Sequence, residues 1–258
     1  MSIPVIGTAV VNSSYWVSRL IYSIDYPVDN FVIINNNGRG EIDEELNSIL
    51  KLKHKFVKKF FVVNLPGNIG VGSAWNLIIK SFLNAPYWVI CNDDIAFGFG
   101  FLEEMKEAAE SSKEVGIVHG RPGDFNIGSW DVFLIKDWVI NEYGLFDENF
   151  YPAYCEDTDY ILRIRKKHLE RVLELKSDYY HGFSKDYYEG GRQTSITEPD
   201  LREKLDQINY MNFEYMTEKW GPKWRTQWPQ EHVCGVEGFP ISYTSFDLEF
   251  ARKKYLGF

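Results

Sequence analysis

The segment YWVICNDD, at residues 87–94, joins a continuous apolar run to an amide and two carboxylates. A short run of this kind predicts a strand that is buried on both faces, as in the parallel sheets of α/β proteins. In such sheets, ligands bind beyond the carboxyl ends of the strands. Asn92, Asp93 and Asp94 therefore mark a candidate site at one edge of a sheet.

The chain before this segment alternates apolar runs with segments of helical periodicity. This alternation predicts βαβ units, a mainly parallel sheet and an α/β fold class. Strands are expected at 3–11, 31–34, 60–63 and 87–91, with helices at 15–24, 41–52 and 68–83 between them. Farther along the chain, we expect strands at 115–119, 129–136 and 171–180 and helices at 101–111, 137–143, 156–168 and 197–220.

The composition is that of a globular protein and excludes several classes. A chain of 258 residues with 45% hydrophobic content is long enough for one large α/β domain. Its net charge of −9 argues against nucleic-acid binding, which requires a basic surface. Cys91, Cys155 and Cys234 are odd in number and lack CxxC spacing, so we expect neither a zinc site nor a disulfide framework. No signal peptide or membrane span is recognisable, so we expect a soluble, cytoplasmic protein.

Polar residues follow several of the predicted strands. Residues 12–14 (NSS) follow the first strand, residues 35–37 (NNN) follow the second, and Asn64 follows the third. One such cluster is ordinary turn chemistry. Several clusters at one edge of one sheet indicate a site for a polar ligand.

The residues Asn92-Asp93-Asp94 have two interpretations. Adjacent carboxylates repel each other unless a cation or hydrogen bonds compensate them. A hard divalent cation such as Mg²⁺ or Mn²⁺ takes oxygen ligands and leaves positions open for phosphate oxygens. The alternative is a simple Asx turn.

A second acidic cluster, Glu156-Asp157-Thr158-Asp159, stands at the start of a predicted helix. Acidic residues there interact favourably with the helix dipole, so capping is one explanation. Three carboxylates are more than a cap needs. A carboxylate kept ionised at a helix N-terminus also suits a base that accepts a proton from a hydroxyl.

His181 is the third candidate, because it follows a predicted strand and precedes cationic residues. A lone histidine is more often structural than a ligand. Lys185 and Arg192, which follow it, are candidates for holding phosphate. The aromatic content of 16% either fills the core or lines a sugar site, and Trp130 is a candidate for the latter role.

In order along the chain, these segments resemble glycosyltransferase family 2 and its relatives with the GT-A fold. The resemblance runs from about residue 3 to residue 184 and rests on order and spacing more than on any one motif. The matching segments are VVNSS (10–14), VIINNNG (32–38), NIGVGSAWN (68–76), WVICNDD (88–94), YGLFDENFYPAYCEDTDY (143–160) and His181. The resemblance implies a GT-A fold, with a Rossmann-like, mainly parallel central sheet flanked by helices.

The family's residue roles carry over onto these positions. The resemblance implies that Asp94 and His181 bind the metal, Mn²⁺ or Mg²⁺. It also implies that Asp157 is the catalytic base, with Glu156 in support. The donor nucleotide would meet Val11, Asn12, Ser14, Asn35, Asn36, Asn37, Asn68, Gly70, Asn76, Asn92 and Asp93. Candidates for contacting the acceptor or phosphate are Asp159, Trp130, Lys185 and Arg192.

Two positions depart from the family pattern. Asn92 takes the place of the first aspartate of the DxD motif, which removes one charge from the metal site. Asn35 stands where many relatives have an aspartate near the base, so UDP is not favoured over GDP or dTDP.

The resemblance implies a metal-dependent, inverting glycosyltransferase that transfers a sugar from a UDP-, GDP- or dTDP-sugar to a hydroxyl of a glycan. A non-catalytic nucleotide-sugar or carbohydrate-binding protein and a sugar-nucleotidyltransferase remain alternatives. The expected organisation is a catalytic domain at 1–194, with a nucleotide-binding half (1–95) and an acceptor half (96–194). A helical extension at 195–258 would pack on the same domain.

Overall fold

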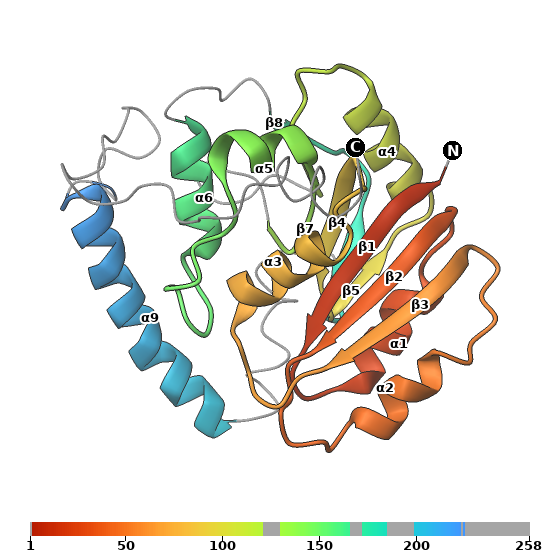
Figure 1. The fold of residues 1–258 in the computed structure, drawn as a ribbon, viewed down its shortest axis with the longest axis horizontal. Coiled ribbons are helices and arrows are strands. Elements are labelled where there is room, and N and C mark those ends of the chain that lie inside the picture. The colour runs from red at the N-terminus through yellow and green to blue at the C-terminus, as the bar shows by residue number, and fades with distance from the viewer. Residues whose placement is uncertain (1, 121–129, 166–171, 185–198, 223, 225–258) are drawn as a thin grey trace.

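The structure is a computed structural model, which describes residues 2–120, 130–165, 172–184, 199–222 and 224. Among these residues, a seven-stranded sheet has the order β3-β2-β1-β4-β7-β6-β8. Its strands are β1 (Ile3–Val10), β2 (Val28–Asn35), β3 (Val57–Asn64), β4 (Tyr87–Asn92), β6 (Ile117–His119), β7 (Val132–Lys136) and β8 (Val172–Glu174). Figure 1 shows the four N-terminal strands side by side in the sheet.

The pairing of these strands confirms the mainly parallel sheet. Strands β1 to β4 are parallel to one another, whereas β7 is antiparallel to both β4 and β6. The register aligns Val10 with Asn35 and Asn35 with Asn64, while Ala9 is aligned with Asn92. The carboxyl ends of four strands therefore lie at one edge, as the positions of the polar clusters predicted.

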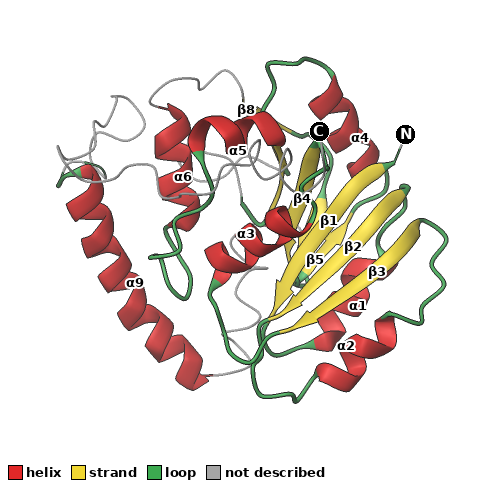
Figure 2. Cartoon of the chain, viewed as in Figure 1, coloured by secondary structure: helices red, strands yellow, loops and turns green. Residues whose placement is uncertain are grey.

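Helices cover both faces of the sheet (Figure 2). Alternate residues of each buried strand point to opposite faces, so Phe31 and Ile33 enter one apolar core and Val32 and Ile34 the other. The first core is covered by α1 (Ser14–Tyr22), α2 (Asp43–Ile49) and α4 (Phe101–Glu110). The second is covered by α3 (Val71–Ser81), α5 (Asp137–Tyr143) and α6 (Glu156–Arg165).

One predicted strand, 171–180, is wrong, because this stretch forms two strands in different sheets. After β8 the chain turns at Lys176 and Ser177, whose backbone N–H groups donate to Glu104. It then forms β9 (Tyr179–His181), which pairs antiparallel with β5 (Ile95–Phe97). Strand β5 was not predicted at all, since three residues carry no recognisable periodicity.

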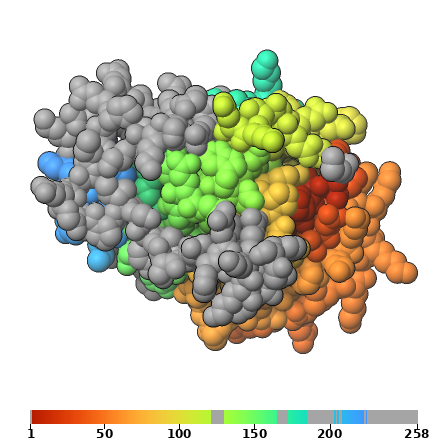
Figure 3. All heavy atoms as spheres, turned by 45° about the horizontal axis from the view of Figure 1, so that its top comes forward, coloured from red at the N-terminus to blue at the C-terminus, as the bar shows by residue number. Residues whose placement is uncertain are grey.

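The helix expected at 197–220 is α9 (Pro199–Trp220). Its end packs through Met216 and Trp220 into a third apolar cluster with Phe150, Cys155 and Leu162. In Figure 3 the green segment, 130–165, lies between the red and orange N-terminal part and the blue of α9. None of the described helices is both long and apolar enough to cross a membrane.

Candidate functional site

The asparagines that follow β2 are engaged with the protein itself. The Asn35 amide donates to Asp43 Oδ1 at 2.5 Å and to Asn64 Oδ1 at 2.9 Å, and its oxygen accepts from the N–H of Asn37. Asn36 accepts from the N–H of Ile69. We call Asn35, Asn36 and Asn37 the asparagine edge. All three are buried, so they act first as connectors between strand ends.

The asparagine edge also positions two neighbouring loops of the predicted donor site. Asn37 donates to Val11 O at 2.7 Å, and Asn36 donates to Gly70 O at 3.3 Å. Gly70 has φ +86°, and a Cβ there would lie 3.1 Å from Pro152 O, so glycine is required at this turn. Asn68 Oδ1 accepts from the N–H of Gly70 and completes the turn into α3.

Ser14, another predicted donor residue, begins α1 and donates to Glu45 Oε2 at 2.8 Å. Both side chains line a cavity of about 390 Å³ between α1 and α2. The preceding Asn12 is partly exposed at the end of β1. Unlike the asparagines after β2, Asn12 and Ser14 are therefore only partly buried.

Two other predicted ligand contacts, Asn76 and Trp130, are buried and engaged by the protein itself. Asn76, 1% exposed, donates to Phe146 O and Glu148 Oε1 and accepts from the N–H of Phe146, each at 2.9 Å. Trp130 is 5% exposed and packs against aromatic rings that include Phe146 and Tyr160. Hydrogen bonds tie Asn76 of α3 to the loop before α6, and ring packing holds Trp130 between β7 and that loop.

The turn between β4 and β5 carries the two acidic residues of the segment YWVICNDD (87–94). Asp93 and Asp94 are 6% and 4% exposed. Pairing of β5 with β9 places His181 opposite Ile95, and the N–H of Gly182 donates to Asp94 O at 2.8 Å. Asp94 Oδ1 consequently lies 3.1 Å from His181 Nε2. The two residues predicted to bind the metal are therefore neighbours.

Asp131 is the functional candidate that sequence reasoning missed. It directly precedes β7, and its backbone oxygen accepts from the N–H of Asn92 at 2.8 Å. Its Oδ2 lies 3.0 Å from His181 Nδ1, so the imidazole stands between two carboxylates. Burial alone would lower the pKa of His181, but the hydrogen bonds with Asp131 and Asp94 raise it to about 10. The available signal was a carboxylate inside the apolar run SWDVFLIK.

Once the imidazole of His181 has lost its proton, the spacing of Asp94 and His181 fits a divalent cation. Two neighbouring ligands of an octahedral ion at about 2.1 Å are roughly 3 Å apart, which is the separation of Asp94 Oδ1 and His181 Nε2. Within the described ranges, no group of three or more His, Cys, Asp or Glu side chains is placed to hold a metal. The remaining ligands would therefore be phosphate oxygens and water, as is usual for Mg²⁺.

Glu156 and Asp157 extend the acidic group at the start of α6. Burial raises the pKa of Asp157, and the nearby charge of Asp131 raises it further. Burial and the charge of Asp157 raise the pKa of Glu156 well above its usual value. The Asp157 carboxylate accepts from the N–H of Thr158 at 2.5 Å. These electrostatic links join one group, which we call the carboxylate cluster and which contains Asp93, Asp94, Asp131, Glu156 and Asp157.

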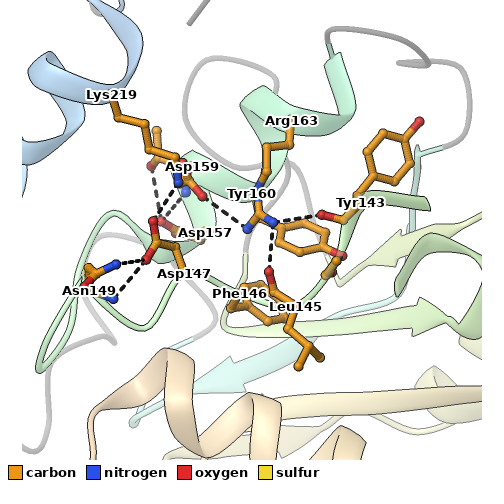
Figure 4. A network of polar contacts seen from close by, with 12 residues as sticks. Tyr143, Leu145, Phe146, Asp147, Asn149, Asp157, Asp159, Tyr160, Arg163 and Lys219 are labelled. Atoms are coloured by element: carbon orange, nitrogen blue, oxygen red, sulfur yellow. Dashed lines mark hydrogen bonds and ion pairs between the residues drawn. The ribbon is translucent and has the colours of Figure 1, made fainter. Parts of the chain in front are cut away.

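Asp159, predicted to contact the acceptor or phosphate, is instead enclosed by protein groups (Figure 4). Its side chain is 0% exposed and lies 3.1 Å from Arg163 and 2.7 Å from Lys219. The indole N–H of Trp220 donates to it at 2.8 Å. Lys185 and Arg192, the two predicted phosphate contacts, lie outside the described residues.

Comparison with known proteins finds similar proteins both by sequence and by structure. No family model matches the chain. A galactofuranosyl glycosyltransferase from Leishmania donovani is 30% identical over 128 residues, which are 46% of this chain and 28% of that protein. The similarity therefore covers only part of both proteins.

Two solved structures share the fold. Mannosyltransferase PcManGT from Pyrobaculum calidifontis, in complex with GDP-Man and Mn²⁺, matches with a TM-score of 0.51 and 13% identity over 67% of this chain and 56% of that chain. Residues 1–349 of S. aureus TarS, in complex with UDP-GlcNAc, match with a TM-score of 0.54 and 13% identity over 68% of this chain and 57% of that chain. The chain thus spans little more than half the length of these solved chains. Its mainly parallel sheet between two layers of helices is the GT-A fold of these glycosyltransferases.

Proposed function

We propose that this protein is an inverting glycosyltransferase that transfers a sugar from a nucleotide-diphosphate donor to a hydroxyl of a glycan. The observation that carries the proposal is the carboxylate cluster at the carboxyl ends of the strands. It joins a pair of residues suited to a divalent cation, Asp94 and His181, to a carboxylate suited to proton transfer, Asp157. The first would stabilise the leaving diphosphate, and the second would accept the proton of the acceptor hydroxyl.

The donor side of the proposal rests on charge. A nucleotide-sugar carries a negatively charged diphosphate, and the cluster brings further negative charge to the same edge of the sheet. A cation between the two would offset their repulsion. Asp94 and His181 would hold Mn²⁺ or Mg²⁺, which would stabilise the charge that develops on the leaving diphosphate. Asp131 would orient His181 for that role, since a carboxylate on the second imidazole nitrogen fixes the ring. Binding of GDP-Man with Mn²⁺ by a protein of the same fold supports this assignment.

The acceptor side rests on Asp157. It is partly exposed, whereas Glu156 beside it is buried, so Asp157 is the more accessible of the two carboxylates. Its raised pKa makes it a stronger base once it is ionised. Asp157 would accept the proton of the acceptor hydroxyl as that oxygen attacks the anomeric carbon. A single displacement of this kind inverts the configuration at that carbon.

The test is a thermal-shift screen of UDP-, GDP- and dTDP-sugars, each with Mn²⁺, with Mg²⁺ and with chelator. A ligand present at 100 times its Kd should stabilise the fold by about 2.7 kcal/mol. We expect one nucleotide class to stabilise the protein strongly with metal and weakly without it. Asp94→Ala should remove the metal-dependent part, whereas Asp29→Asn, an exposed carboxylate paired with Lys58, should not.

The screen is followed by an assay of donor hydrolysis and transfer on the donor that binds. Equal stabilisation with chelator and with Mn²⁺ would contradict the metal role. Tight binding without hydrolysis or transfer would favour a non-catalytic nucleotide-sugar-binding protein, the alternative that Asn92 and Asn35 keep open. No response to any nucleotide-sugar would refute the proposal.

A further inference from the structure

We propose that α9 positions the acidic residues of the site: Asn212, Lys219 and Trp220 hold the turn at 153–155 and the first turn of α6 so that Glu156 and Asp157 face Asp93, Asp94 and Asp131, the other members of the carboxylate cluster. This inference rests on the proposed function and assigns a role to a helix that the family resemblance does not cover. The three side chains are positioning residues, because none of them belongs to the carboxylate cluster.

The turn before α6 has an uncommon backbone. Tyr154 and Cys155 have φ values of 77° and 76°, in the left-handed region that residues other than glycine rarely adopt. Two such residues in succession persist only where the surrounding structure holds them. The Asn212 amide donates to Ala153 O at 2.8 Å and to Tyr154 O at 3.0 Å. Helix α9 therefore binds the two carbonyls on which this turn depends.

The first turn of α6 is held from the same helix (Figure 4). Lys219 Nζ lies 2.7 Å from Asp159 Oδ1 and 2.7 Å from Asp147 Oδ2, and all three side chains are 0% exposed. Trp220 Nε1 donates to the same Asp159 oxygen at 2.8 Å. One buried cation thus ties the loop at Asp147 to the helix that begins with Glu156.

We call Asn212, Lys219 and Trp220 the clamp. The charges at the start of α6 explain why these contacts are needed. Asp159 is compensated by Lys219 and Arg163, but Glu156, three residues earlier on the same helix, has a buried Oε2 without a hydrogen-bond partner among the described residues. A carboxylate in that position favours rotation of the turn toward water. The contacts from α9 oppose that rotation, so they keep Glu156 and Asp157 directed at the other three members of the cluster.

The chain contains its own reporter of this turn. Cys155 lies within it and is 6% exposed, whereas Cys91, in the central strand β4, is 1% exposed, and neither forms a disulfide with another described residue. The experiment measures the rate at which a thiol reagent modifies each cysteine, with peptide mass spectrometry to separate them. Opening of the turn exposes Cys155 alone, while global unfolding exposes both.

The variants are Asn212→Leu and Trp220→Phe, which keep the packing of α9, and Lys219→Met, which removes the cation. Lys106→Met is the matched control, because Lys106 is a second buried lysine in an ion pair, with Glu110, on α4. We expect Cys155 to be modified at least tenfold faster in the three clamp variants, with Cys91 unchanged. In the control, both rates should stay within twofold of the wild-type rates. If Lys219→Met does not fold, the other two variants decide.

A kinetic measurement separates positioning from packing. In Asn212→Leu and Trp220→Phe, kcat for transfer should fall at least tenfold, while the donor KM and the affinity for nucleotide with Mn²⁺ change less than twofold. Unchanged modification of Cys155 overturns the clamp, and faster modification with normal kcat overturns its role in positioning. If the wild type transfers no sugar, the proposed function fails, but the ratio of Cys155 to Cys91 modification still tests the clamp.

Discussion

The asparagine edge and the carboxylate cluster lie at the same end of the sheet and differ in how their polar atoms are satisfied. In the asparagine edge, each side chain both donates and accepts within the protein, as at Asn35. In the carboxylate cluster, Asp93 Oδ2 and Glu156 Oε2 are buried without a hydrogen-bond partner among the described residues. Burial and a neighbouring carboxylate raise the pKa of both groups.

This difference separates polar residues that hold the fold together from polar residues that are available to bind a ligand. Buried polar groups in proteins are nearly always hydrogen-bonded, so a satisfied group such as Asn35 needs no ligand to explain it. The imidazole of His181 compensates part of the negative charge of the carboxylate cluster, and the excess that remains is unfavourable unless something binds there. Under the proposed function, cation binding and proton transfer belong to the carboxylate cluster, whereas the hydrogen bonds of the asparagine edge hold the strand ends together.

The largest expected effect is at Asp157. Asp157→Asn should lower transfer by about 10²–10⁴-fold, the usual contribution of a general base, while nucleotide binding is retained. In the wild type, kcat should fall as the pH drops through the pKa of Asp157, which burial raises, because the base is then protonated. Initial rates across a pH series check both points. Asp29→Asn is the control, and turnover of Asp157→Asn within threefold of wild type would rule out this base.

The next effect tests Asp131 as the partner of His181. Asp131→Asn keeps the shape but weakens the interaction with His181 Nδ1, so Mn²⁺ affinity in the presence of nucleotide should fall by about 10–100-fold. Electron paramagnetic resonance of free Mn²⁺ measures this directly. Asp137→Asn makes the same change at the other end of β7 and should leave the affinity unaltered. Equal losses of Mn²⁺ affinity in the two variants would show that Asp131 acts through its charge alone and not through His181.

A smaller effect is expected in the asparagine edge, and on stability rather than ligand binding. Asn35→Ala removes the hydrogen bonds to Asp43 and Asn64 and leaves the N–H of buried Asn37 without its acceptor, so unfolding should become easier by about 1–3 kcal/mol. Donor affinity should change less than threefold. Asn30→Ala, in the same strand, removes a single hydrogen bond to Pro4 O and should cost about 1 kcal/mol. Denaturant unfolding and nucleotide titration compare the stability and the donor affinity of the two variants. Loss of donor binding without loss of stability would place Asn35 in the ligand site after all.

The two regions also differ in how far the sequence predicted them. Strands β1 to β4 are predictable because each contains an apolar run, and runs of this kind form the interior of a parallel sheet. The approach of His181 to Asp94 depends on β5 and β9, two short strands that pair across a long stretch of chain. Asp131 reaches the cluster only through the same long-range geometry. Asn76 is the converse case: its motif predicts a ligand contact, but Phe146, 70 residues away, uses its amide.

The smallest expected effect concerns Glu156, and its sign is the sharpest test of the comparison. Because burial and Asp157 raise the pKa of Glu156, the native state holds this proton more tightly than the unfolded chain does. The resulting stabilisation is present at low pH and is lost as the pH rises through the raised pKa. Glu156→Gln should therefore stabilise the metal-free protein at pH 7, by on the order of 1 kcal/mol, and should have little effect at pH 4.

Glu104 provides the opposite case in the same chain. Burial alone would raise its pKa, but hydrogen bonds from Ser177 and from the N–H of Lys176 lower it. Its stabilisation is present above the unfolded pKa and is lost as the pH falls, so Glu104→Gln should destabilise the protein at pH 7. Thermal unfolding of both variants at pH 7 and pH 4 gives the two signs. If both substitutions destabilise at pH 7, Glu156 is compensated within the fold and the carboxylate cluster no longer differs from the asparagine edge.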